Sequence, residues 1–214
     1  VTRNGTVKRL RLTEINTARK AGIRALSLEE GDELISVSRT SGNDNIIIGS
    51  HDGMAICFNE NEVRPMGRDA AGVRGISLSD GDFVVGAEKA EEGKTLLTVT
   101  VNGYGKRTEL SEYLRTGPNG EKCAQSRGGK GLKNYNITPK TGNVAGCRVV
   151  SESDDVMLIE NGGVIIRIPA ASINVYKRDT QGVIVMRIEE GNQVVSLERV
   201  EAMEEEAKGE EPQA

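Results

Sequence analysis

The sequence predicts an all-β protein of propeller-like architecture, built from four repeats of four strands each. The chain has 214 residues, including 26 glycines and no Trp, a composition typical of short strands joined by many turns. Three turn or loop landmarks recur four times in the same order. Each repeat of about 50 residues also holds short strand-like runs, as a propeller blade does.

The three landmarks differ in kind. The first is an Asn-Gly or Asp-Gly dipeptide, typical of a tight hairpin turn, at residues 4–5, 52–53, 102–103 and 161–162. The second is a longer basic loop in which an arginine precedes a glycine: Arg19 and Gly22, Arg68 and Gly72, Arg127 and Gly131, Arg178 and Gly182. Its glycine recurs after 50, 59 and 51 residues. The third is a Gly-Asp or Gly-Asn dipeptide at residues 31–32, 81–82, 142–143 and 191–192.

Strand-like runs lie between these landmarks, rich in β-branched residues and bounded by turn residues. The first run follows the hairpin turn, at residues 6–12 and 54–58. The second follows the basic loop, at residues 23–28, 73–78 and 183–188. The third follows the Gly-Asp turn, at residues 33–38, 83–87 and 193–197. The fourth closes the repeat, at residues 45–48, 95–99 and 156–159.

We therefore expect one domain over residues 1–200, with blades at roughly 1–50, 51–101, 102–160 and 161–200. The net charge of −4 divides into +1 over residues 1–200 and −5 over residues 201–214, which hold six Glu and one Lys. Because like charges repel, this acidic tail is expected to be disordered. The chain starts in mid-repeat and its last repeat has no fourth strand, so we expect a fragment of a longer protein.

The composition also limits the classes of function. No apolar run approaches the roughly 18 residues that cross a membrane. Three cysteines without paired spacing predict reduced cytosolic thiols rather than a metal site. The only histidine, His51, lies beside a turn, and neither a nucleophile motif nor a complete phosphate-binding loop motif is present. We expect no catalytic residue, no metal and no cofactor in this chain.

The basic loop at residues 125–131 carries the strongest functional signal. Two cations lie among three glycines, with no apolar side chain to bury. Glycines let the backbone approach a ligand closely, and Arg and Lys beside such a bend can bind phosphate. A solvated flexible loop is the alternative, which the recurrence of the loop disfavours. Arg68, Arg127 and Arg178 each lie four residues before the landmark glycine, so on a disc they would follow the rim.

A second basic feature recurs just after the hairpin turn. The pairs Lys8-Arg9 and Lys106-Arg107 occupy equivalent positions in the first and third repeats. They are expected to be either solvated strand edges or a second track of contacts with phosphate groups, and the sequence does not separate the two interpretations.

These residues resemble a known family. Residues 125–131 resemble the gyrase A box, Q-R-R-G-G-K-G, with Ser126 in place of its first arginine. Residues 62–76 and 102–108 resemble other repeat segments of the same family, and the acidic tail is also similar. The chain therefore resembles the C-terminal domain of the DNA gyrase A subunit over its whole length.

The resemblance implies a β-pinwheel, a propeller-like disc whose neighbouring blades exchange strands, with a basic rim that wraps duplex DNA. It implies blades three to six of six, and partnership with the rest of gyrase A and with gyrase B in a cytoplasmic, nucleoid-associated A2B2 complex. That complex is an ATP-driven type II topoisomerase that introduces negative supercoils. Its ATP, Mg²⁺ and breakage-reunion tyrosine belong elsewhere, so Tyr104, Tyr113, Tyr135 and Tyr176 are not assigned that role and the chain alone should be non-catalytic.

The residues expected to contact DNA come from the basic loops and the pair after the third hairpin turn. They are Gln125, Ser126, Arg127, Gly128, Gly129, Lys130, Gly131, Arg19, Lys20, Arg24, Arg68, Arg74, Lys106, Arg107, Lys177 and Arg178. Phosphate contacts by such residues position DNA without reading its bases. The acidic tail can compete with DNA for the same rim, which makes autoinhibition a hypothesis.

Two other functions remain open. The related C-terminal domain of the topoisomerase IV A subunit has no clear box and does not wrap DNA strongly, and residues 125–131 argue against it. A protein-interaction propeller would bind through loops near its axis and show little dependence on salt.

Overall fold

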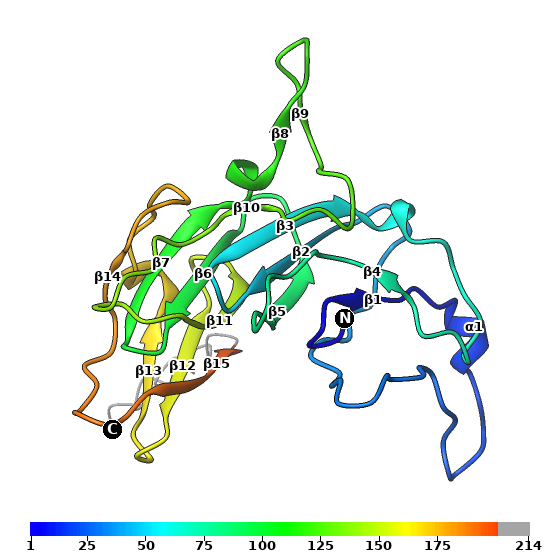
Figure 1. Cartoon of the computed structure of the whole chain (residues 1–214), viewed down its shortest axis with the longest axis horizontal. Coiled ribbons are helices and arrows are strands. Elements are labelled where there is room, and N and C mark those ends of the chain that lie inside the picture. Colours follow the sequence, from blue (N-terminus) through cyan, green and yellow to red (C-terminus); the bar gives the residue numbers. More distant parts are fainter. Residues whose placement is uncertain (201–214) are drawn as a thin grey trace, which may run out of the picture.

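The computed structural model describes residues 1–200 of the chain as a curved array of small antiparallel sheets (Figure 1). The predicted acidic tail, residues 201–214, lies outside the described residues. Within residues 1–200 no helix is long and apolar enough to cross a bilayer.

Strands dominate the fold, and the helical segments are single turns. The first two repeats contain β1 (Thr6–Val7), α1 (Leu12–Ile15), β2 (Asn45–Ser50), β3 (Met54–Asn59), η1 (Glu60–Glu62), β4 (Val73–Arg74), β5 (Val84–Lys89) and β6 (Thr95–Thr100). The last two contain β7 (Tyr104–Glu109), η2 (Leu110–Tyr113), β8 (Arg115–Thr116), β9 (Lys122–Cys123), β10 (Leu132–Lys133), β11 (Val144–Val150), β12 (Asp155–Glu160), β13 (Ile165–Pro169), η3 (Ala170–Ser172), β14 (Val183–Ile184) and β15 (Val194–Val200).

Neighbouring repeats exchange strands. One sheet has the order β10-β3-β2-β5 and the next has the order β11-β6-β7-β14, so each combines strands from three successive repeats. The outermost strand of each sheet comes from the following repeat: Leu132 pairs with Ala55, and Val183 pairs with Gly105. The third sheet has the order β13-β12-β15. The pinwheel implied by the resemblance is confirmed.

In the second, third and fourth repeats the strand after the basic loop is short, and in the second and fourth it is shorter than the predicted run. It pairs for two residues and then bends, because the next two amides donate to a hairpin-turn carbonyl of the preceding repeat, as Val185 and Met186 do to Gly103. The bend directs one side chain inward, four residues after the landmark glycine of each of these three repeats. These buried side chains are Ile76, Tyr135 and Met186, each at most 3% exposed.

The first repeat departs from the prediction. Its runs at residues 23–28 and 33–38 are not strands, and residues 12–15 form a helical turn instead of continuing the first strand. The third run pairs only with the first residues of the chain, through a bridge between Thr2 and Leu34 and backbone hydrogen bonds from Ile35 N and Ser36 N to Val1 O. A strand needs a partner for its backbone N–H and C=O groups, and neither run has a strand of residues 1–200 beside it to form a ladder. The two runs therefore do not become strands. The predicted turn at residues 161–162 also shifts by one, since Gly163 takes the positive φ of +94°.

The core is divided among the blades. One cluster packs Ile48, Phe58 and Val84 beneath the β10-β3-β2-β5 sheet. Another packs Leu97 against Leu158 and so joins the last two sheets. Each blade therefore buries its apolar face against its neighbour, which fixes the relative positions of the loops on the outer edge.

Candidate nucleic-acid interface

The loop at residues 125–131 is anchored by its first residue. Gln125 is 1% exposed. Its backbone N–H donates to Cys57 O at 2.7 Å, and its side-chain Nε2 donates to Tyr113 O at 2.9 Å. The glutamine of the box-like segment thus attaches the loop to the preceding blade, and its side chain faces the interior rather than solvent.

The glycines of this loop let it lie flat on the neighbouring repeat. Gly128 N donates to Gly75 O at 2.8 Å, and Gly129 O accepts from Ser77 N at 2.9 Å. Gly131 has a φ of +77°, and a Cβ there would overlap the carbonyl of Ala55. A side chain is excluded by this close approach as well as by the backbone conformation.

Two predicted residues of the loop are free to meet a ligand. Ser126 and Lys130 are exposed, and the Lys130 side chain forms no hydrogen bond or ion pair with residues 1–200. Arg127 differs, because its guanidinium donates to Arg74 O and, at 3.3 Å, to Glu62 O. The two cations of the segment therefore have different surroundings.

The arginines equivalent to Arg127 in other repeats also differ in whether the side chain is bonded to the protein. Arg178 is half-buried, and its guanidinium donates to Lys133 O at 3.1 Å and lies 3.9 Å from the Glu112 carboxylate. Arg68 is half-buried as well, but its side chain has no hydrogen bond within residues 1–200. Other predicted cations are exposed: Arg19, Lys20, Arg24, Arg74 and Lys177.

The expectation for Lys106 and Arg107 is corrected by their burial. Lys106 is fully buried, and its Nζ donates to the carbonyls of Lys177, at 2.7 Å, and of Arg178. Burial lowers the pKa of Lys106 to about 7. Arg107 is 4% exposed, and its Nε donates to Ile173 O at 2.7 Å. These side chains form neither a solvated strand edge nor an accessible DNA track.

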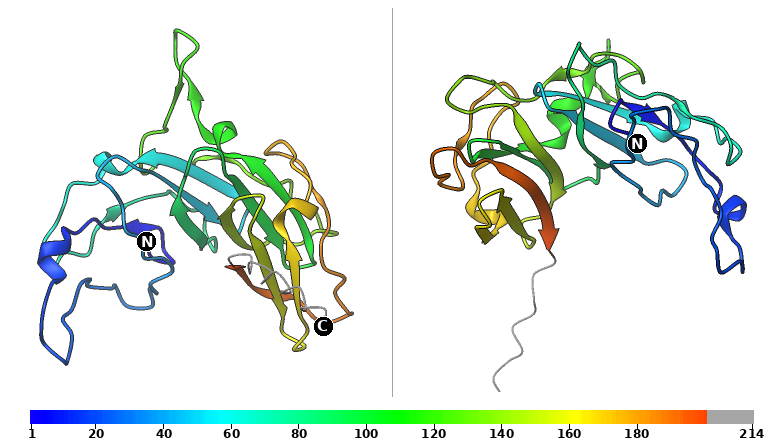
Figure 2. Two further views of the ribbon diagram at one scale, coloured as in Figure 1. Left: turned by 180° about the vertical axis from the view of Figure 1, so that it is seen from behind. Right: turned by 60° about the horizontal axis from the view of Figure 1, so that its bottom comes forward.

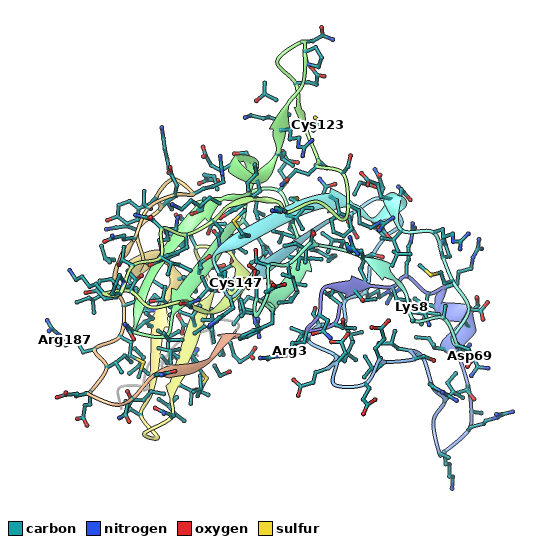
Figure 3. All side chains as sticks on the ribbon, viewed as in Figure 1. Arg3, Lys8, Asp69, Cys123, Cys147 and Arg187 are labelled. Carbon is teal, nitrogen blue, oxygen red and sulfur yellow. The ribbon has the colours of Figure 1, made fainter. Side chains whose placement is uncertain are left out.

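The equivalent pair in the first repeat has the same structural role. Lys8 Nζ donates to the carbonyls of Arg68 and Ala70 at 2.6 and 2.7 Å. Burial lowers the pKa of Lys8, and nearby Asp69 opposes that shift. Figure 3 shows Lys8 and Asp69 in the same part of the molecule, where the basic loop of the second repeat meets the first. Arg9 forms an ion pair of 3.0 Å with buried Glu60.

One basic feature was missed in the sequence. Strands β8 and β9 form a hairpin that projects from the body beside residues 125–131 (Figures 1 and 2), and it carries exposed Arg115 and Lys122. The hairpin spans 115–123, nine residues, which accounts for the step of 59 rather than 50 between landmark glycines. That longer step was the signal that could have located it.

The structure also shows exposed cations at one equivalent position in successive repeats. The second residue after the landmark glycine is an exposed cation in three successive repeats: Arg24, Arg74 and Lys133. Arg74 and Lys133 lie on the exchanged outer strands β4 and β10. We call these three residues the cation track.

The chain was compared with known proteins. The family model described as the DNA gyrase C-terminal domain, beta-propeller, matches residues 1–41, 44–91, 94–123, 124–151 and 154–201. The DNA gyrase A protein of Escherichia coli strain K12 is 42% identical over 199 residues, which cover 93% of this chain and 22% of that protein. The chain thus spans about a fifth of the length of the curated relatives it matches.

Two solved structures have similar folds at 28% identity. The structure of a DNA gyrase A C-terminal domain matches with a TM-score of 0.78, covering 92% of this chain and 63% of that one. The crystal structure of the C-terminal domain of a DNA topoisomerase IV matches with a TM-score of 0.84, covering 94% and 61%.

Proposed function

The chain belongs to the DNA gyrase C-terminal domain family, and on that premise we propose that it binds duplex DNA without sequence preference and wraps it along its outer edge. In the whole protein this wrapping would serve negative supercoiling by an A2B2 complex with the rest of gyrase A and with gyrase B. ATP, Mg²⁺ and the breakage-reunion chemistry would belong to those other parts, in a cytoplasmic complex associated with the nucleoid. The chain itself would be non-catalytic.

The observation that carries the proposal is the cation track. Arg24, Arg74 and Lys133 occupy one position in successive repeats, and each is exposed. Cations at a regular interval along a curved edge suit the phosphates of a bent duplex. Bending a duplex over such a surface costs on the order of several kcal/mol, which contacts from several blades must offset together.

The remaining exposed cations widen this surface. We assign phosphate contacts to Arg19, Lys20, Lys130 and Lys177 in addition to the cation track, because their side chains are exposed and lie in the basic loops. Ser126 can donate a hydroxyl hydrogen bond to the same DNA backbone. Lys106 and Arg107 are left out, since their side chains are buried.

The test is a change in DNA linking number. Relaxed circular DNA is incubated with the chain and a nicking-closing topoisomerase, and protein is then removed before topoisomers are counted. A shift that grows with protein concentration and fades at high salt is expected, because wrapping by cations is screened by salt. Tight binding in a gel without any shift would contradict wrapping.

A second candidate is the role of a topoisomerase IV C-terminal domain, favoured by the TM-score of 0.84 to that fold. The same experiment distinguishes this role from DNA wrapping, because salt-dependent DNA binding with little change in linking number would support the topoisomerase IV role. DNA binding that does not depend on salt would instead support a protein-interaction propeller.

A further inference from the structure

The basic loops of successive repeats are joined by recurring contacts. At each join, which we call a junction, the basic loop of the later repeat lies along the segment that follows the landmark glycine of the earlier one. The backbone bond from Ser77 N to Gly129 O, 2.9 Å, marks the second junction. The bond from Asn136 N to Thr180 O, 3.2 Å, occupies the equivalent place in the third.

An arginine crosses the second junction. The guanidinium of Arg127 donates to Arg74 O and to Glu62 O, and the Arg127 backbone N–H donates to the Glu62 carboxylate at 2.7 Å. Both acceptor residues belong to the preceding repeat. Arg127 therefore binds two separate elements of its neighbour, the turn η1 and the exchanged strand β4.

The third junction has the same components, but only one of its two arginine contacts is a hydrogen bond. Arg178 NH1 donates to Lys133 O at 3.1 Å, and its Nε lies 3.9 Å from the carboxylate of Glu112 in η2. Lys133 follows its landmark glycine by two residues, as Arg74 does. The same three components, an arginine, a glutamate of the helical turn and a strand carbonyl, thus recur one repeat later.

The carbonyls at both junctions belong to residues of the cation track. Each arginine therefore fixes the backbone of the residue whose exposed side chain would meet the phosphate. We propose, resting on the function proposed above, that Arg127 and Arg178 are positioning residues that set the spacing between successive DNA-contacting cations, and are not phosphate ligands themselves.

The chemistry of the two side chains supports this division. A guanidinium presents several donors in a fixed plane, so it can hold two acceptors at once. At Arg127 two of these acceptors are backbone carbonyls, and a phosphate would have to compete with them. Lys130, exposed in the same loop, has no such partners within residues 1–200.

The first junction shows what the contact requires. The equivalent arginine, Arg68, has no side-chain hydrogen bond within residues 1–200. The segment it would reach, around Arg24, is not a strand. A regular exchanged strand therefore accompanies the arginine contact at the two junctions where it is formed.

The experiment compares a variant that keeps charge with one that keeps the contact. Arg127→Lys retains the positive charge but loses the planar donor pair, and Arg178→Lys does the same one repeat later. Lys130→Gln removes a charge from the same loop and leaves the junction intact. The melting temperature of each variant is measured by thermal unfolding. The salt dependence of DNA affinity and the linking shift at saturating protein are then measured at 25 °C, where all variants are expected to be folded.

Arg127→Lys is expected to lower the melting temperature by about 3–6 °C. It should leave the salt slope unchanged while reducing the linking shift by about half, because one of two clamped junctions is lost. Lys130→Gln should leave the melting temperature unchanged and reduce the slope of log affinity against log salt by about 0.9. Arg68→Lys is the control for melting temperature and should show no decrease.

A full linking shift in Arg127→Lys and Arg178→Lys would overturn the positioning role, even if the melting temperature falls. An Arg127→Gln variant whose salt slope decreases by about 0.9 with an unchanged melting temperature would make Arg127 a phosphate ligand and overturn it as well. Failure of the proposed function has a different pattern, since the wild-type chain itself would then show no salt-dependent binding and no linking shift.

Discussion

The ammonium group of Lys106 lies 2.7 Å from the backbone carbonyl oxygen of Lys177, in the basic loop of the next repeat. Lys106 is fully buried, whereas the Lys177 side chain is exposed. Two lysines that the sequence places in one DNA-binding set therefore have different roles. One holds the loop in place from beneath, and the other presents a charge on its surface.

The buried lysine predicts a pH dependence of stability. Burial lowers the pKa of Lys106 from its ordinary value of 10.5 to about 7. Between these values the unfolded chain binds a proton that the folded chain does not, so stability rises with pH in that interval and is flat below it. Relative to Lys106→Met, the wild-type free energy of unfolding should increase by up to about 1.4 kcal/mol per pH unit between pH 7 and 10.

Urea denaturation of both proteins across that range measures the difference, and other titrating groups cancel in the comparison. Lys106→Gln serves as a second variant that can still hydrogen-bond to the loop. Parallel stability curves for wild type and both variants would contradict the shift in the pKa of Lys106.

The exposed lysine of this pair, Lys177, is predicted to contribute to DNA binding. Lys177→Gln should weaken binding similarly for all DNA sequences and reduce the salt slope by about 0.9, because one phosphate contact is lost. Lys177→Arg keeps the charge and is the matched control. Fluorescence anisotropy titrations at several salt concentrations measure both quantities. An unchanged slope in Lys177→Gln would remove this residue from the interface.

The projecting hairpin predicts a separable contribution. Strands β8 and β9 pair Arg115 with Cys123, so joining Leu114 directly to Ala124 spans a short distance and restores the spacing found in the other repeats. The hairpin residues in these strands are exposed, and the fold should survive their deletion. We expect the salt slope to decrease by up to about 1.8, because Arg115 and Lys122 are lost together.

A double variant, Arg115→Gln with Lys122→Gln, keeps the hairpin and should reproduce that decrease. A deletion that unfolds the chain is recognised by circular dichroism and leaves the double variant as the test. If neither variant changes the slope, the hairpin lies outside the DNA path.

The sequence located the repeating landmarks because glycine turns are local signals. Gly72, Gly131 and Gly182 all take positive φ values at the end of the basic loop, as a recurring glycine there indicates. The strand exchange itself followed from the resemblance to a family, since pairing between distant segments leaves little trace in local pattern.

The sequence did not separate Lys106 from Lys177, because both are lysines beside a turn. Their difference depends on which blade covers them, and that is a property of the assembled fold. The strands expected at residues 23–28 and 33–38 failed for a related reason. β-propensity expresses how well a residue fits a paired sheet, and those runs have no long partner within residues 1–200.

Replacing the glycine of the basic loop by alanine is predicted to reduce stability by different amounts in different repeats. Gly22 and Gly131 both have positive φ values, but a Cβ on Gly22 would meet no heavy atom within 4 Å, whereas one on Gly131 would overlap the carbonyl of Ala55. Gly22→Ala should therefore cost only the backbone strain, about 1–2 kcal/mol. Gly131→Ala adds displacement of strand β3 and should cost at least about 3 kcal/mol.

Chemical denaturation of the two variants measures this difference, with Gly81→Ala as a further control, because its Cβ also meets nothing within 4 Å at a φ of +80°. Gly131→Ala should in addition reduce the linking shift, since the loop that carries Lys130 must move away from the blade. Equal destabilisation by Gly22→Ala and Gly131→Ala would mean that backbone conformation alone requires glycine there. The close approach of the loop to β3 would then have no energetic weight.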